Sequence, residues 1–273
     1  MSPSGTDERA STVEELVSDL VRLGVAPGDL LMVHASLRRI GAIEGRAGGV
    51  IDAIDRSVAP GGTWVMILGS EDDHDWVNQH PLEERAALLD DAEPFDHLVT
   101  PVLPEVGTLA EVFRTTPGTV VGDHPDGRFG ARGARADELV RDPPWDDYYG
   151  PGSTLDRLVR GGGKVLRLGA NLDTVTVLHH AEYLADVPDK RTVTRARRVR
   201  TPEGSEVRII HALDDEHGIA NDPGEEDYFA VILREYLATG AGSTGSVGDA
   251  PAELLDAAEL CRFGADWMTR NLR

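Results

Sequence analysis

The first 70 residues alternate between amphipathic helical patterns and short apolar runs, and this alternation most restricts the possible folds of the chain. Apolar residues recur at helical spacing over Ser11–Leu23, and Gly24 ends that pattern. An apolar run over Asp29–His34 predicts a buried strand, the stretch Val50–Val58 predicts a helix, and Trp64–Leu68 predicts a second strand. A strand, a helix and a strand in succession indicate an α/β fold, with a central mixed sheet flanked by helices.

The rest of the chain shows no internal repeat and no convincing linker, so we expect one domain over residues 1–273 with a flexible N-terminus over residues 1–10. Further elements are expected as helices over Gly107–Thr115, Ala134–Val140, Gly152–Arg160 and Asp173–Ala185, a strand over Lys164–Leu168, a hairpin of Thr192–Val199 and Val207–Ala212, and closing helices over Tyr228–Ala238 and Ala252–Met268. The sequence does not give the order of the strands.

The charge balance narrows the possible partners. The 273 residues include 27 Lys+Arg and 48 Asp+Glu, a net charge of −21, which disfavours nucleic acid and anionic membranes as partners. The single cysteine, Cys261, excludes an intramolecular disulfide and a cysteine-based zinc site. The chain has no apolar run long enough for a transmembrane helix, and its polar first ten residues do not resemble a signal peptide, so we expect a cytoplasmic protein.

Charged residues gather in three stretches. Glu71–Asp96 has ten acids and one base, and Asp214–Asp227 has seven acids and no Lys or Arg. These stretches are either solvated faces or the lining of one cleft for a cationic substrate. Lys190–Arg200 has six bases and no acid, which favours either a counter-charged strand within the protein or a site for a phosphorylated cofactor.

The stretch from Gly169 to Glu182 follows a predicted buried strand, so its loop should lie at the carboxyl end of that strand, where ligands bind in open α/β sheets. Asp173, Thr176, His179 and Glu182 are spaced by three residues, which places Thr176 and His179 near one helix face. An imidazole there is suited to general-base work near neutral pH. The alternative is a capping aspartate and a histidine of the core or surface.

Two turns offer further candidate contacts. The first strand leads into Val33–Gly41, where backbone N–H groups, Ser36, Arg38 and Arg39 either hold an amide or phosphate of a ligand or form an ordinary strand-end turn. Glycines and hydroxyl groups in Gly150–Thr154 indicate an anion site or a helix cap.

The chain resembles the aminoglycoside 3-N-acetyltransferases, the antibiotic N-acetyltransferase family, from about Val13 to Met268. The resemblance is most specific in the stretch from Leu168 to Glu182, which includes His179. The other ordered blocks are Met32–Leu37, Pro60–Thr63, Pro94–Asp96, Gly107–Leu109, His124-Pro125, Gly152–Leu155, Gly162–Val165, Asp227–Phe229 and Gly245–Gly248.

The resemblance implies transfer of an acetyl group from acetyl-CoA to the 3-amino group of a 2-deoxystreptamine aminoglycoside, which confers antibiotic resistance. It implies the α/β fold of this family and not the GCN5-related acetyltransferase fold. His179 matches the general base, and an acid at or beside Glu226 matches its orienting partner, with Glu226 preferred over Asp227. Thr176 and Asp173 match positions near the reacting centre, Thr176 as a candidate catalytic hydroxyl and Asp173 as a contact to the antibiotic.

The resemblance also assigns the two substrate sides, with acetyl-CoA as co-substrate and no metal. Its cofactor-binding positions are His34, Ala35, Ser36, Leu37, Arg38, His124, Pro125, Val247 and Gly248. Its antibiotic-binding positions, besides Asp173, are Glu71 or Asp72 and Asp214 or Asp215. Arg128 stands where the family usually has a serine. We expect a monomer or a homodimer.

We expect direct transfer in a ternary complex, because Cys261 lies far from every motif. Thr176 or a backbone N–H is a candidate oxyanion donor. Three alternatives remain: an acetyltransferase of the same fold with another amine acceptor, a hydrolase that uses Ser36 or Ser153 with His179, and a cation-binding protein that only sequesters the antibiotic.

Overall fold

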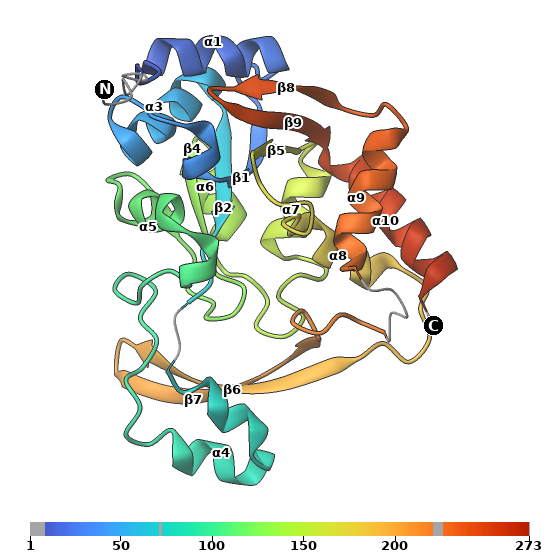
Figure 1. Ribbon diagram of the computed structural model, residues 1–273. Coiled ribbons are helices and arrows are strands. Elements are labelled where there is room, and N and C mark those ends of the chain that lie inside the picture. The colour runs from blue at the N-terminus through green and yellow to red at the C-terminus, as the bar shows by residue number, and fades with distance from the viewer. Residues whose placement is uncertain (1–8, 71–72, 221–225, 273) are drawn as a thin grey trace, which may run out of the picture.

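The computed structural model describes residues 9–70, 73–220 and 226–272. The main sheet in these residues has seven strands in the order β3-β4-β2-β1-β5-β9-β8 (Figure 1). The strands are β1 Leu30–Ala35, β2 Thr63–Ile67, β3 Val120–Val121, β4 Phe129–Gly133, β5 Lys164–Leu168, β8 Ser243–Val247 and β9 Ala250–Asp256. Because β1 pairs in parallel with both β2 and β5 while the outer pairs are antiparallel, the sheet is mixed.

Helices cover both faces of this sheet, and the central strands alternate between the two cores. Leu31 and Val33 of β1 pack with α1 Val13–Leu23, α3 Arg46–Val58 and α5 Thr108–Thr115. Met32 faces the opposite core. That core is completed by α6 Ala136–Val140, α7 Thr154–Arg160, α8 Val177–Leu184, α9 Tyr228–Ala238 and α10 Ala257–Asn271. The expected mixed α/β fold is therefore confirmed.

Polar caps fix where several helices begin. Thr12 and Glu15 form a reciprocal capping box at α1. The side chains of Ser153, Asp227 and Asp256 each accept a backbone N–H at the starts of α7, α9 and α10. Of these capped helices, α9 contributes its first two residues, Tyr228 and Phe229, to the site described below.

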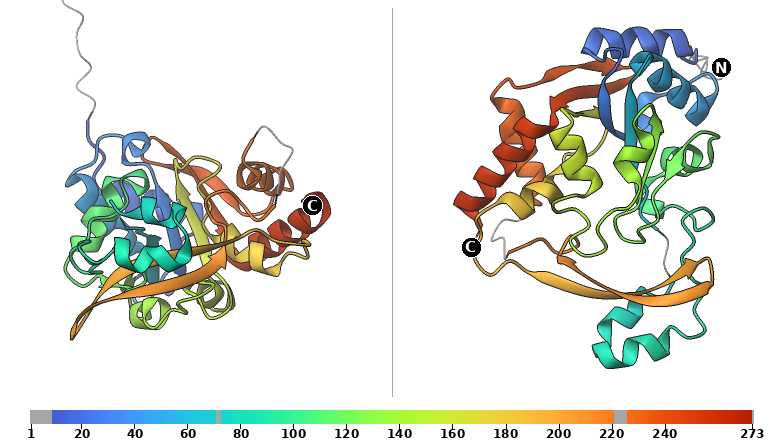
Figure 2. Two further views of the ribbon diagram at one scale, coloured as in Figure 1. Left: turned by 90° about the horizontal axis from the view of Figure 1, so that it is seen from below. Right: turned by 180° about the vertical axis from the view of Figure 1, so that it is seen from behind.

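A long hairpin stands apart from the main sheet. Its strands β6 Thr192–Thr201 and β7 Gly204–Leu213 pair only with each other among the described residues, apart from a bridge between Phe95 and Val199. Figure 2, from behind, shows the hairpin crossing beneath the main body with α4 Leu82–Leu88 on its far side. The short elements η1 Asp75–Gln79, η2 Pro104–Val106 and α2 Leu37–Ile40 complete the fold.

Most of the expected elements are confirmed, and the last part of the chain is the main exception. The expected helix over Ala252–Met268 is wrong in its first part, because β9 occupies Ala250–Asp256 and the helix begins only at Ala257. Ala250, Ala252 and Leu254 face one core at the period of a strand, a signal that the alanines obscure. The helix expected from Asp173 begins at Val177.

The expected flexible N-terminus falls largely on residues 1–8, which lie outside the described residues. No helix within the described ranges is long and apolar enough to cross a bilayer.

Candidate active site

The central parallel strands β1 and β5 end side by side, and the segments that follow them form the wall of a cavity of about 580 Å³. We call it the first cavity. Its described lining consists of Val33–Arg39, Met66, Ile67, Glu105–Leu109, Tyr149, Gly169–Asn171, Thr174, Thr176 and His179. The structure thus brings together His34, Ala35, Ser36, Leu37 and Arg38 with Thr176 and His179, at the sheet edge where ligands bind in α/β folds.

His34 is a buried polar group on the wall of the first cavity. Its Nε2 atom has no hydrogen-bond partner within the described structure, and the ring is 3% exposed. Burial, with the nearby Arg167 guanidinium, lowers the pKa of His34 to about 3. His34 is therefore a neutral imidazole at physiological pH, available for a hydrogen bond without carrying charge.

A second cavity of about 660 Å³ lies on the other side of the helix start. Of the described residues that line it, six are acidic and one is an arginine: Asp173, Glu182, Asp215, Glu216, Glu226 and Asp227, and Arg191. His179 lines both cavities. The imidazole thus lies where a space lined mainly by neutral and basic side chains, with Glu105 as an acid, meets a space lined mainly by acids.

His179 is held in place from three directions. Its Nδ1 atom lies 2.8 Å from Oε2 of Glu182, whose side chain is 1% exposed. The ring stacks on Tyr149 at 5.0 Å between centroids, and the edge of Phe229 contacts it at 4.8 Å. Because Nδ1 faces a carboxylate, the ring carries its proton there and leaves Nε2 as the free basic nitrogen.

The charges around His179 favour its protonated form. Burial acts to lower the pKa of His179, but the Glu182 carboxylate, with Asp215 and Asp227 farther away, outweighs burial and raises the pKa above its ordinary value. A histidine whose pKa is raised in this way is a stronger base than a free imidazole. The arrangement can accept a proton through Nε2 and stabilise the resulting cation through Glu182.

The acid that the structure places against His179 is Glu182, whereas the resemblance favours Glu226 as the orienting acid. Glu226 does not approach His179; its two carboxylate oxygens pair with Arg234 at the surface. Asp227 accepts the backbone N–H of Phe229 and caps α9. Glu182 reaches the imidazole because it lies one turn after His179 on α8. The spacing of three residues was the available signal, but it did not rank Glu182 above the other acids.

Four expected cofactor contacts lie away from the first cavity. His124 is fully buried, with Nδ1 accepting the Gly127 N–H at 2.8 Å and Nε2 lying 2.9 Å from the carbonyl of Trp145. Pro125 lines another cavity, described below. Val247 is buried beneath α1, and the N–H of Gly248 donates to Asp19. These residues shape turns and core, and their contact with the cofactor stays a prediction.

Of the residues expected to contact the antibiotic, some line the second cavity and others do not. Asp215 lines the second cavity, where it accepts hydrogen bonds from Arg195 and from the Tyr148 hydroxyl, each at 2.8 Å. Asp214 is buried and accepts two backbone N–H groups of its own turn. Asp173 is exposed on the wall of the second cavity. Glu71 and Asp72 lie outside the described residues.

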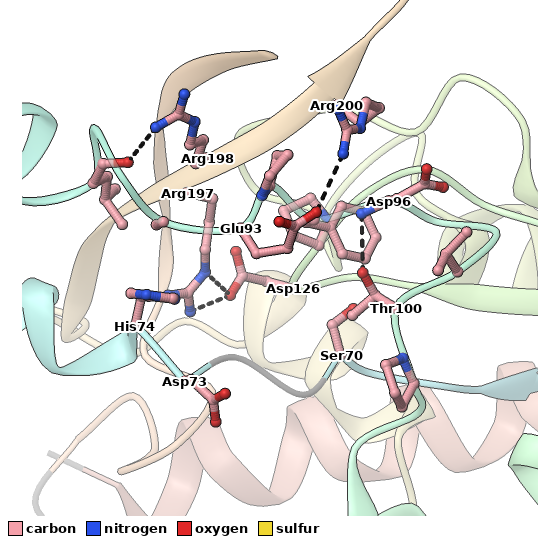
Figure 3. Close-up of a pocket in the computed structure, with 17 residues that line it drawn as sticks. Ser70, Asp73, His74, Glu93, Asp96, Thr100, Asp126, Arg197, Arg198 and Arg200 are labelled. Carbon is pink, nitrogen blue, oxygen red and sulfur yellow. Dashed lines mark hydrogen bonds and ion pairs between the residues drawn. The ribbon is translucent and has the colours of Figure 1, made fainter. Parts of the chain in front are cut away.

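The basic stretch from Lys190 to Arg200 is a counter-charged strand. Figure 3 shows three of its arginines around a third cavity of about 380 Å³: Arg197 pairs with Asp126, Arg198 donates to the carbonyl of Leu89, and Arg200 contacts Glu93. The contacts of Arg198 and Arg200 connect the hairpin to the segment after η1, and the Arg197 pair connects it to the turn between β3 and β4. Their mixed charges and their place outside the first cavity do not support the alternative of a phosphorylated cofactor there.

Arg128 stands where the family that this chain resembles usually has a serine. In the structure the Arg128 side chain has a structural role. The side chain is fully buried and donates to the carbonyls of Gly69, His97 and Pro101. It therefore ties the segment before η2 to the ends of β2 and β4.

We expect Arg128→Met to lower the free energy of unfolding by about 1–3 kcal/mol, because the change leaves these carbonyls without a charged donor. Urea denaturation measures this as a lower midpoint at an unchanged slope. Arg22→Met is the matched control, since Arg22 is exposed and contacts Asp19 and Ser18 of its own helix at the surface. Equal midpoints for the two variants would contradict the role given to Arg128.

A sequence profile of the family described as aminoglycoside 3-N-acetyltransferase matches residues 32–269. The aminoglycoside N(3)-acetyltransferase VIII of Streptomyces fradiae is 38% identical over 261 residues, which cover 94% of this chain and 91% of that protein.

Two solved structures extend the comparison. A structure described as AAC-IIIb in a binary complex with CoASH has a TM-score of 0.91 and 39% identity, and the match covers 97% of this chain and 98% of that one. A sisomicin-bound structure of AAC-VIa has a TM-score of 0.90 and 31% identity, with coverage of 97% and 100%. The profile match includes the described walls of both cavities and His179, and the chain therefore belongs to the aminoglycoside 3-N-acetyltransferase family of acyltransferases.

Proposed function

We propose that this protein transfers the acetyl group of acetyl-CoA to the 3-amino group of 2-deoxystreptamine aminoglycosides and so confers resistance to them. The observation that carries the proposal is the place of His179, which lines two chemically different cavities at once. A relative solved with CoASH and another solved with sisomicin support one cavity for each substrate.

The first cavity suits the thioester arm of acetyl-CoA. Its walls combine Ser36, the neutral His34 imidazole and backbone groups of the strand ends, which match the amides of a pantetheine chain. Arg38 is exposed on the same wall and supplies positive charge where a phosphate would lie. The second cavity, with its carboxylates, suits a substrate with several ammonium groups.

His179 is the proposed general base. Its Nε2 removes a proton from the 3-amino group while the nitrogen attacks the thioester carbonyl, so that a C–N bond forms and the carbonyl electrons move to oxygen. Collapse of this intermediate breaks the C–S bond, and the leaving thiolate takes the proton from the imidazolium. The Glu182 carboxylate stabilises that imidazolium in the interval.

Thr176 is a candidate donor to the developing oxyanion. It lines the first cavity three residues before His179, at the start of α8, and its hydroxyl makes no capping hydrogen bond to the helix. A hydroxyl that is not used for capping is available to a ligand.

The proposal includes direct transfer, because two of the candidate nucleophiles, Cys261 and Ser153, are poorly placed for an acyl-enzyme. Cys261 is buried in α10, and burial raises the pKa of its thiol to about 12. Ser153 is fully buried and caps α7. Neither residue lines the first or second cavity, which also weakens a hydrolase that would use Ser153.

A thiol-release assay tests the proposed function. Acetyl-CoA is mixed with the protein and with kanamycin-, gentamicin- or neomycin-type acceptors, and the acetylated amine is located in the product by NMR. We expect acceptor-dependent thiol release with acetylation at the 3-amino group. Release with other amines only would identify a different acceptor, turnover without acetyl-CoA a hydrolase, and antibiotic binding without release a sequestering protein.

A further inference from the structure

The Glu182 carboxylate has a second partner besides His179, and it comes from a different helix. Tyr228, the first residue of α9, donates its phenol proton to Oε1 of Glu182, while Oε2 faces Nδ1 of His179. The carboxylate therefore bridges the two side chains. Tyr228 is itself 7% exposed and Glu182 is 1% exposed, so neither side chain can exchange this contact freely for water.

The loop beside the second cavity determines the direction of the phenol hydrogen bond. The backbone N–H of Ile219 points at the Tyr228 oxygen at 3.4 Å, and an N–H can only donate. The single phenol proton is therefore directed to Glu182. Burial, together with the Glu182 charge, strongly raises the pKa of Tyr228, so the hydroxyl remains a donor over the whole working pH range.

The same loop approaches Tyr228 closely at a glycine. Gly218 has a φ of +73°, and a Cβ atom at this position would lie 2.8 Å from Cε1 of Tyr228 and 2.9 Å from its oxygen. Asp227 fixes the other side by capping α9 at the adjoining residue. The phenol is thus held between the helix start and a loop that can approach it only without a side chain.

We propose that Tyr228 is a positioning residue for acetyl transfer, whose hydroxyl fixes the Glu182 carboxylate so that its other oxygen stays on Nδ1 of His179 and leaves Nε2 facing the substrates. A carboxylate with one partner can rotate about its last bond and release the imidazole. With donors on both oxygens, rotation breaks two hydrogen bonds at once in a site nearly closed to water.

The Tyr228 hydroxyl also reduces the negative potential that the Glu182 carboxylate produces at His179. A donor on Oε1 draws negative charge away from Oε2, so removal of the phenol should make the imidazole more basic. The other charged or titratable groups near the pair are Asp215, Asp227, Tyr149 and Lys190, and these stay in place when Tyr228 is replaced. The effect of the variant can therefore be assigned to the lost hydroxyl.

The test compares Tyr228→Phe with Tyr236→Phe, a matched control two turns later on the same helix, buried in the core and packed on Phe263. This inference rests on the proposed function, so wild-type thiol release is measured first. We expect Tyr228→Phe to lower kcat about tenfold, the weight of one hydrogen bond to a charged group, and to move the acid limb of kcat/KM to higher pH by about half a unit. The KM for acetyl-CoA and the control variant should remain near wild type.

NMR titration of the His179 imidazole makes the test independent of turnover. We expect a higher His179 pKa in Tyr228→Phe, and the same direction in Gly218→Ala, which displaces the phenol from the loop side. An unmoved pKa and pH limb in both folded variants would overturn the positioning role and reduce Tyr228 to packing. Absence of thiol release by the wild type would contradict the proposed function alone, because the NMR result still decides the role of Tyr228.

Discussion

Replacement of His179 by alanine should lower kcat by about 10²–10⁴-fold while acetyl-CoA still binds. The reason is geometric, because the imidazole is the residue that lines both cavities while the rest of the first cavity is built by other segments. Nε2 is the proposed acceptor of the proton from the attacking amine, and the variant has no other base at that position. Thiol release measures kcat, and calorimetry measures acetyl-CoA affinity.

The loss must be separated from a loss of folding. The His179 side chain is one fifth exposed, so its removal should leave the core intact, and a thermal scan provides the control. His179→Gln is a second control, because its amide can occupy the space of the ring without serving as a base. Near-normal kcat in either folded variant would remove His179 from the proposed mechanism.

Glu182→Gln should lower kcat about 10²-fold or more and shift the pH dependence in a defined direction. The glutamine can still accept the Nδ1 proton but does not stabilise an imidazolium, and its amide can also present a donor that selects the wrong tautomer. The direction of the change in the pKa of His179 follows from the charges. Glu182 raises the pKa of His179 against the effect of burial, so removal of that charge should lower the pKa.

The base acts in its neutral form, so kcat/KM rises with pH through the pKa of His179. In the wild type the midpoint of this rise should lie above the ordinary histidine pKa of about 6.5. In Glu182→Gln the midpoint should move to lower pH. Tyr228→Phe should move it the opposite way. A profile of kcat/KM between pH 5 and pH 9 distinguishes the two changes.

Glu226→Gln is the matched comparison for the orienting acid. Because Glu226 forms a half-exposed ion pair with Arg234, we expect a kcat within about twofold of wild type. A severe loss in Glu226→Gln together with a normal Glu182→Gln would restore the family-based assignment and contradict the structure.

The central strands and the place of His179 could be predicted because their signals are local. The apolar run over Asp29–His34 and the strand over Lys164–Leu168 are continuous in the sequence, and β1 and β5 occupy them. His179 follows the second strand by a short loop, so its place at the sheet edge follows from the α/β rule.

The residues that contact His179 could not be predicted, because these contacts depend on packing between distant segments. The resemblance leaves Glu226 and Asp227 as the candidates, and the position of Arg234 on α9 shows that Glu226 is already paired. Tyr149 and Tyr228 contact the His179–Glu182 pair from two other segments, and nothing in their local sequence pattern marks them.

Strands β8 and β9 could not be predicted from the sequence for a different reason. The residues of β8, Ser-Thr-Gly-Ser-Val, lack the apolar character that identifies a strand, and four of the five are exposed. Such a strand is stabilised by its ladder with β9 rather than by side-chain burial. Its neighbour β9 is rich in alanine, a residue that favours helices, so the tertiary pairing overrides the local preference.

The two cavities are built from different parts of the chain. The first cavity takes its described wall from segments between Val33 and His179, and the second takes most of its wall from residues 191–229. Substitutions in the later stretch that spare the contacts of Tyr228 and Phe229 with the His179–Glu182 pair can therefore accumulate over evolutionary time without disturbing the proposed thioester side. Under the proposed function, a lineage with this architecture can diversify in the aminoglycosides it accepts while its donor chemistry stays constant.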